Sequence, residues 1–252
     1  MREITDAIVL MAGTGSRLRA SGETLPKPLI MVSGRPLICY IAEALQKVGV
    51  RNLHVVVGAD GDRLASALRP VIPSEIGLHP TPNPAWQKQN GISVLAAAGY
   101  VGAPFLLTMS DHLFDQAIVD CLLDNFDPGL LNLAVDRKLD SIFDPRDAMK
   151  VQIRGHAVTR IGKDLLEFDA IDTGLFVCPS EIFDYLERAK LDKGENDCSL
   201  ADAVRLMAGD EKVRAVDIGE SWWQDVDTAP MLQHAAKQIA RARMLSQRDA
   251  LR

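Results

Sequence analysis

The stretch Ala7–Leu18, with the sequence AIVLMAGTGSRL, gives the clearest indication of the fold class. Its first five residues are apolar and predict a short buried strand. The next residues include Gly13 and Gly15, which let the backbone bend so that several N–H groups converge. A strand that is followed directly by such a loop is typical of α/β proteins that bind phosphate.

Strand-like and helix-like segments alternate after this stretch. Leu53–Val57 and Phe105–Met109 are again short apolar runs, whereas Pro36–Val48 and Asp60–Leu68 have helical periodicity. Strands that alternate with helices predict a doubly wound, mostly parallel α/β sheet of the Rossmann-like kind.

The later part of the chain changes character. A glycine turn between Lys150–Ile153 and Ala157–Ile161 predicts a hairpin, and hence a small β-rich elaboration around residues 140–175. Further expected elements are strands at Ile171–Val177 and Val213–Ile218, a helix at Ser199–Ala208 capped by Ser199, a surface loop at His79–Pro84, and a helical tail from about residue 229. We expect one domain over residues 1–252.

Composition narrows the function classes. The net charge of −6 argues against a general nucleic-acid binder, which needs a basic face. No run reaches the ~18 apolar residues of a membrane span, and the first residues lack a signal-peptide layout, so we expect a cytoplasmic protein. The four cysteines form no CxxC pair and are expected to be reduced core residues.

The glycine loop is a weak signal by itself. A dinucleotide fingerprint would need a glycine at Leu18, and a P-loop would need GK[ST]. Arg17 and the lysine of Pro26–Leu29 add two cations that could hold phosphate oxygens and stabilise charge that develops on a leaving pyrophosphate. The alternative is a glycine turn with two solvated cations. We take Arg17 and Lys27 as candidate catalytic residues and the loop as a nucleotide site, with Met11, Ala12, Gly13, Thr14 and Gly15 as its contacts.

Carboxylates follow two distant segments. Asp111 comes two residues after the end of Phe105–Met109, where open α/β sheets bind ligands. Asp225 and Asp227 lie on the same side of a predicted extended segment. Carboxylates that converge from distant segments suit Mg²⁺, which keeps several waters and bridges substrate phosphates. The alternative is that all three only cap turns or helices.

The segments LMAGTGSR (10–17) and PKPL (26–29) together resemble the signature of sugar-nucleotide pyrophosphorylases and related nucleotidyltransferases. Met11 departs from the usual alanine. The resemblance implies that Asp111 and Asp225, the acid of the Trp-x-Asp segment, bind the metal. Some phosphocholine-type relatives use the acid two residues later, which is Asp227 here.

A closer resemblance, to inositol-1-phosphate cytidylyltransferase, extends from Ala7 to about Leu232. It is carried by Asn90–Ser93, Thr108–His112, Arg160–Leu165, Glu167–Asp169, Ile171–Gly174 and Asp225–Thr228. It implies that CTP and a small phosphorylated alcohol, myo-inositol 1-phosphate, are joined with release of pyrophosphate. In that family the domain is often fused to a membrane CDP-alcohol phosphotransferase. This sequence shows no such segment, so we expect a separate partner of that kind to use the product.

The same resemblance implies roles for individual residues. Asn90, Gly91 and Ser93 would lie near base and ribose, with Ser110 as a further nucleotide contact. Lys163 would meet substrate phosphates, Lys150 matches a cation of the cytidylyl members, and Asp172, Thr173 and Gly174 would face the polyol. Lys163 could instead be a solvated hairpin lysine, and Asp172 could only bond backbone N–H groups. We expect His112 to be structural, because a phosphate oxygen needs no base.

The expected mechanism is direct in-line attack by the acceptor phosphate on the α-phosphorus of CTP. Rival readings are a sugar-1-phosphate uridylyl- or thymidylyltransferase, a cytidylyltransferase for phosphocholine or aminoethylphosphonate, and a catalytically silent nucleotide-binding module. The aromatic content of 5% argues against a cage for a quaternary ammonium. The oligomeric state stays open.

Overall fold

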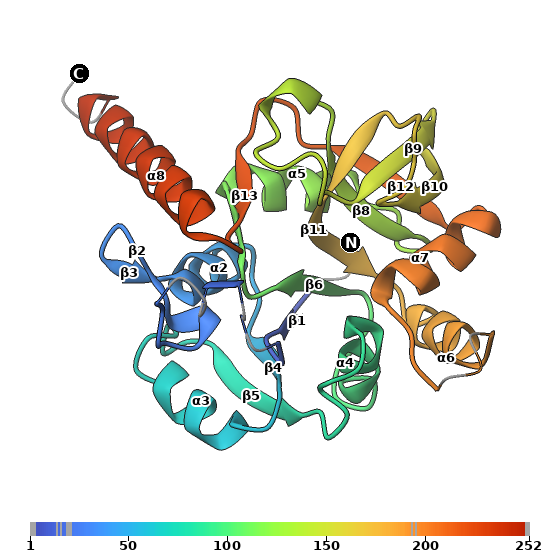
Figure 1. Cartoon of the computed structure of the whole chain (residues 1–252), viewed down its shortest axis with the longest axis horizontal. Helices are drawn as coiled ribbons and strands as arrows, with labels where there is room; N and C mark the ends of the chain where they lie inside the picture. Colours follow the sequence, from blue (N-terminus) through green and yellow to red (C-terminus); the bar gives the residue numbers. More distant parts are fainter. Residues whose placement is uncertain are drawn as a thin grey trace.

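A computed structural model describes residues 4–13, 15, 17–18, 22–192, 194 and 196–249. Within these residues nine strands form one mixed sheet in the order β5-β4-β1-β6-β11-β8-β12-β10-β9 (Figure 1). The strands are β1 Asp6–Leu10, β4 Asn52–Val57, β5 Gly77–Pro82, β6 Phe105–Met109, β8 Leu131–Asp136, β9 Lys150–Arg154, β10 Ala157–Gly162, β11 Ala170–Cys178 and β12 Val213–Asp217. The helices are α2 Leu37–Lys47, α3 Gly61–Leu68, α4 Asn90–Ala96, α5 Gln116–Asn125, α6 Ile182–Asp192, α7 Leu200–Gly209 and α8 Ala229–Asp249.

The first half of the sheet is parallel. Strand β1 lies between β4 and β6, and β5 pairs with the outer side of β4, all in the same direction. The segments that follow β1 and β6 therefore leave the sheet at one common edge. The strands predicted at the start of the chain are confirmed, and so is the doubly wound Rossmann-like class.

The second half of the sheet is mixed. Strand β11 is antiparallel to both of its main neighbours, β6 and β8, and β12 runs parallel to β8. The β9–β10 hairpin closes the far edge, and β9 also pairs with β11. The predicted β-rich elaboration is thus an extension of the central sheet.

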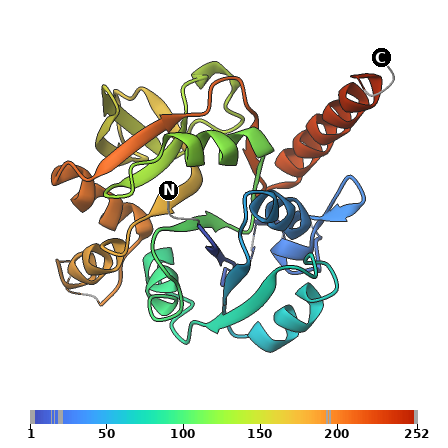
Figure 2. The ribbon, with the colours of Figure 1, turned by 180° about the vertical axis from the view of Figure 1, so that it is seen from behind.

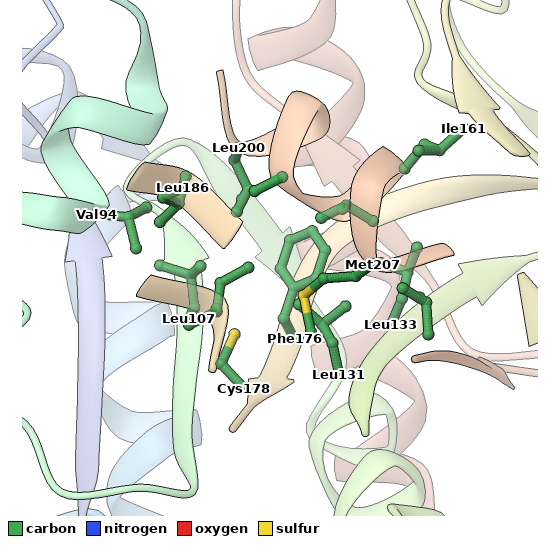
Figure 3. Packing of buried hydrophobic residues seen from close by; sticks show 14 of the residues in the cluster. Val94, Leu107, Leu131, Leu133, Ile161, Phe176, Cys178, Leu186, Leu200 and Met207 are labelled. Atoms are coloured by element: carbon green, nitrogen blue, oxygen red, sulfur yellow. The ribbon is translucent and has the colours of Figure 1, made fainter. Parts of the chain in front are cut away.

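Helices cover both faces of the sheet, as strand alternation requires. Ile8 and Leu10 of β1 face the cluster that includes α4, α6 and α7, whereas Ala7 and Val9 face α2, α3 and α5. Phe176 lies in the middle of the first cluster, between side chains of α7 and of the strands (Figure 3). Helix α7 begins with the predicted cap, since Ser199 and Asp202 form a reciprocal capping box.

One local prediction is wrong. The proline-rich segment His79–Pro84 is not a surface loop for most of its length, because His79–Pro82 belongs to the edge strand β5. Prolines are tolerated there because an edge strand pairs on one side only, and Pro80 and Pro82 alternate with residues that can donate to β4. Proline content alone does not distinguish an edge strand from a loop.

Helix α8 projects away from the body, as both views show (Figures 1 and 2). Its first turns are anchored in a third apolar cluster, in which Ala235 packs with Leu18, Ile30 and Val226. Within the described part of the chain, no helix combines the length and apolar character that a membrane crossing needs.

Candidate active site

A two-stranded ribbon brings the distant carboxylates together. Strand β7 (His112–Phe114) starts directly after Asp111 and pairs antiparallel with β13 (Trp223–Asp225), so that Asp225 lies opposite His112. The Val226 N–H continues this pairing by donating to the Asp111 carbonyl, at 2.9 Å. The predicted extended segment that contains Asp225 and Asp227 therefore lies beside the end of β6, which places these two acids next to Asp111.

Lys27 lies at the centre of these carboxylates. It begins the short 3-10 helix Lys27–Leu29, and its ammonium group forms ion pairs with both Asp111 and Asp227. The glycine loop packs against it, since a Cβ on Gly15 would lie 3.3 Å from the Lys27 Cβ and Gly15 has φ +62°. Side-chain exposure is 11% for Lys27, 19% for Asp111 and 15% for Asp227, so this cluster is largely shielded from water.

Burial and charge oppose each other in this cluster. Burial lowers the pKa of Lys27, but the carboxylates of Asp111 and Asp227 outweigh it and raise that pKa. Burial raises the pKa of Asp111, but His112 and Lys27 outweigh it and hold that pKa well below its usual range. Both groups are therefore charged at neutral pH.

His112 links this cluster to the opposite wall of the site. Its Nδ1 lies 2.6 Å from the Asp111 Oδ1, and its ring stacks on Trp223. A Cβ on Gly174 would lie 2.5 Å from the His112 Cδ2, so the chain approaches the imidazole there as only glycine can. The neighbouring Asp172 is a second, half-buried acid, and desolvation raises its pKa to about 6.

A second ion network is more exposed. The Arg17 Nη1 donates to the Asp147 Oδ2 at 3.0 Å, and Arg17 also pairs with Asp227. The other Asp147 oxygen pairs with Lys163. Side-chain exposure is 54% for Arg17, 39% for Asp147 and 54% for Lys163. One carboxylate thus connects the glycine loop with the segment after β10.

A cleft of about 970 Å³ lies between these groups and the second half of the sheet. Seven of the predicted site residues line it: Arg17, Asn90, Lys163, Asp172, Gly174, Asp225 and Asp227. Lys27 and Asp111 are connected to it through Asp227.

Other predicted residues lie away from the cleft surface. Ser93 is 4% exposed and accepts a hydrogen bond from Asn83, and a Cβ on Gly91 would meet the Cys198 carbonyl at 2.6 Å. Thr173 is buried and donates to the Ala134 carbonyl, while Lys150 donates to the Lys163 carbonyl. Met11 and Ser110 are buried at the ends of β1 and β6, Ala12, Gly13 and Gly15 lie in the loop after β1, and Thr14 is outside the described residues.

Asn90 has a structural partner as well as a place at the cleft. Its Oδ1 accepts a hydrogen bond from the Leu200 N–H, at 2.9 Å, in the first turn of α7. This bond ties the start of α4 to the start of α7. The predicted role of Asn90 near the base stays a prediction.

Sequence reasoning missed four acidic residues of the cleft, Asp136, Asp144, Asp147 and Glu220, of which Asp136 and Asp147 contact other side chains that line it. Asp136 is 3% exposed and accepts hydrogen bonds from the Trp223 indole N–H and the Lys138 backbone N–H. It ends strand β8, an apolar run followed by an acid, which is the signal that identified Asp111. Asp147 lies in an irregular polar loop, where neither periodicity nor motif marks it.

The carboxylates can be tested for metal binding by their donor set. Within the described ranges, no three His, Cys, Asp or Glu side chains converge as a ready-made metal site. Mg²⁺, however, is commonly held by one or two carboxylates together with substrate phosphates and water. Burial and the charges of Asp227 and Asp111 raise the pKa of Asp225. An added cation would relieve this repulsion, so the residues fit a metal that arrives with a polyphosphate.

Comparison with known proteins agrees with this geometry. The MobA-like NTP transferase domain family matches residues 7–203. The chain belongs to this nucleotidyltransferase family. Among curated proteins it is similar to the bifunctional IPC transferase and DIPP synthase of Rubrobacter xylanophilus, with 33% identity over 94% of this chain and 52% of that protein. The protein of the same name from Aquifex aeolicus is 29% identical over 94% of this chain and 52% of its own length. The chain thus spans about half the length of these relatives.

Solved structures share the fold of this nucleotidyltransferase. The inositol-1-phosphate CTP transferase from T. maritima superposes with a TM-score of 0.81 at 25% identity, over 94% of this chain and 97% of that one. A UDP-glucose pyrophosphorylase complexed with UDP-glucose gives a TM-score of 0.78 at 17% identity, over 95% and 99% of the two chains. The second likeness concerns the fold alone.

Proposed function

We propose that this chain transfers CMP from CTP to a phosphorylated polyol, myo-inositol 1-phosphate, and releases pyrophosphate. Support comes from the names of its relatives, IPC transferases and an inositol-1-phosphate CTP transferase, which match nearly the whole chain. The observation that carries the proposal is the meeting of Arg17, Lys27, Asp111 and Asp227 from three distant segments beside one cleft. Nucleotidyl transfer needs this combination of phosphate-binding cations and carboxylates.

The reaction requires positioning and charge stabilisation. A phosphate oxygen of the acceptor attacks the α-phosphorus in line, the bond to the β-phosphate oxygen breaks, and pyrophosphate leaves with the negative charge. Arg17 and Lys27 would hold the β- and γ-phosphates, because a fixed guanidinium and ammonium stabilise the charge on the leaving group. Lys163, whose ammonium group shares the Asp147 carboxylate with Arg17, would hold a substrate phosphate beside Arg17. No covalent intermediate and no general base are needed.

Mg²⁺ fits the carboxylates Asp111, Asp225 and Asp227. Bound there, it would neutralise charge on the phosphates that react. His112 fixes one oxygen of Asp111 at 2.6 Å, which orients that carboxylate towards its other partners.

The acceptor would occupy the wall formed by Asp172 and Gly174. Both residues line the cleft, and Asp172 has a second oxygen beyond the one that accepts from the Gly174 N–H at 2.7 Å. A carboxylate that accepts hydrogen bonds suits the hydroxyl groups of a polyol. The product, a CDP-polyol, would supply a CDP-alcohol phosphotransferase, a pairing that agrees with the bifunctional names of the relatives.

A substrate matrix tests this proposal. The four NTPs are each combined with inositol 1-phosphate, phosphocholine and hexose 1-phosphates in the presence of Mg²⁺, and pyrophosphate release is measured. We expect turnover with CTP and inositol 1-phosphate. Turnover with UTP or dTTP alone would replace the cytidylyl assignment by a sugar-nucleotide one, and pyrophosphate release from no pair would favour a silent nucleotide-binding module.

A further inference from the structure

The loop that joins β8 to β9, residues 137–149, forms one side of the cleft. Phe143, Asp144 and Asp147 of this loop line the cleft. Two residues of the loop, Phe143 and Asp147, contact side chains from other segments. The Phe143 ring lies 5.1 Å from the ring of His234 on α8, and Asp147 forms ion pairs with Arg17 and Lys163.

Asp147 uses each of its oxygens for a different cation. Its Oδ2 accepts from the Arg17 Nη1 at 3.0 Å, and its Oδ1 pairs with the Lys163 ammonium group. These two cations are 146 positions apart in the sequence, yet one carboxylate spans them. Two oxygens of one phosphoryl group could contact the same pair of cations in the same way.

We propose that Arg17 and Lys163 form a single phosphate subsite, and that Asp147 occupies it until a substrate phosphate displaces the carboxylate. The proposal deepens the proposed function and rests on it in taking a nucleotide polyphosphate as the ligand. Asp147 is then a positioning residue, because it holds both cations at the spacing of one anionic group.

The exposure of the three side chains makes such an exchange feasible. All three are more than one-third exposed, and exposed ion pairs contribute little free energy, so a ligand can replace them. Lys163 and Arg17 lower the pKa of Asp147, so the competing carboxylate is charged when the ligand arrives. A ligand must therefore bring more charge than one carboxylate, which favours polyphosphates over singly charged anions.

The test measures binding of inorganic tripolyphosphate to the full chain by calorimetry. Replacing Asp147→Asn removes the competing charge and keeps the size of the side chain. We expect the Asn variant to bind tripolyphosphate about three- to tenfold more tightly than the wild type, a gain on the scale of two exposed ion pairs. Asp147→Ser should behave in the same way.

Two controls separate this effect from a general change of charge. Asp140→Asn removes a charge from an exposed position of the same loop and should change the affinity less than twofold. In a Lys163→Met background, replacing Asp147 should improve binding much less than in the wild type, because one of the two paired cations is gone.

Unchanged or weaker binding by Asp147→Asn would overturn the proposal, and so would an equal gain in Asp140→Asn. Absence of tripolyphosphate binding in the wild type and in the variants would do the same. Tripolyphosphate carries neither base nor acceptor. A failure of the CTP and inositol 1-phosphate assignment in the substrate matrix would therefore leave this result standing, and the reverse also holds.

Discussion

The two ion networks of the site contain similar residues in different surroundings. In the inner network, Lys27 lies between Asp111 and Asp227, and none of the three side chains is more than 19% exposed. In the outer network, Asp147 bridges Arg17 and Lys163, and the two cations are 54% exposed. Arg17 also pairs with Asp227, so the networks are connected.

Their difference in exposure predicts that the two networks contribute differently to the stability of the fold. Removing one partner of a buried ion pair leaves an uncompensated charge and costs roughly 3–5 kcal/mol, whereas an exposed pair contributes about 0–1 kcal/mol. Without ligands, the inner network is thus expected to stabilise the fold much more than the outer network, whose partners a ligand can replace at little cost. The variants below test whether this division holds.

The largest expected effect is a loss of turnover when Asp111, a member of the inner network, loses its charge. Asp111→Asn keeps the shape of the side chain but removes the charge that faces Lys27 and a bound metal. We expect kcat/KM for CTP and inositol 1-phosphate to fall at least about 1000-fold, or ~4 kcal/mol of transition-state stabilisation. Pyrophosphate release measures this, with Asp140→Asn as the matched control and thermal unfolding as the check of folding. Near-normal turnover would remove Asp111 from the mechanism.

The second effect is a loss of folding stability when Lys27, the cation of the inner network, is replaced. Lys27→Met leaves Asp111 and Asp227 as neighbouring shielded carboxylates without their cation. We expect the free energy of unfolding to fall by about 3 kcal/mol at pH 7, as determined by urea denaturation. A loss below about 1 kcal/mol would show that water screens this cluster and that the contrast between the networks is false.

The third effect is a pH dependence in the wall opposite the cluster. The pKa of Asp172 is about 6 in the folded chain, above its ordinary value, so the folded state binds more protons between pH 4 and 6. Stability should therefore fall as the pH rises through this window. Asp172→Asn keeps an acceptor for the Gly174 N–H and removes the titration, so its stability relative to the wild type should rise by about 2 kcal/mol from pH 4 to pH 7. Urea unfolding at each pH measures this, and a stability difference between the two proteins that stays constant from pH 4 to pH 7 would contradict the prediction.

The smallest effect belongs to the outer network. Lys163→Met removes one end of the Asp147 bridge, and we expect the free energy of unfolding to change by less than about 0.5 kcal/mol. Urea denaturation beside Lys27→Met makes this a matched comparison of two lysine-to-methionine changes. A loss as large as that of Lys27→Met would show that the bridge stabilises the fold and is not exchangeable.

The elements near the start of the chain could be predicted because their signals are local. Apolar runs at 7–11, 53–57 and 105–109 and the helical periodicity of 36–48 each depend on neighbouring residues, and the structure confirms them. Strand β8 was missed although its run ends in Asp136, and edge strand β5 was taken for a loop because its prolines mask its pairing. Strand order β11-β8-β12 depends on contacts between distant segments, which no local pattern encodes.

The types of chemical groups in the site can be read from the sequence: a glycine loop, cations at Arg17, Lys27 and Lys163, and acids at Asp111, Asp225 and Asp227. Which of these groups contact each other, and how exposed to water each one is, depends on the packing of distant segments. The β7–β13 pairing places Asp227 on Lys27, and the loop after β8 places Asp147 between Arg17 and Lys163. The strength of a charge pair depends on the separation and the exposure of its two groups, and both are set when different segments of the chain pack together.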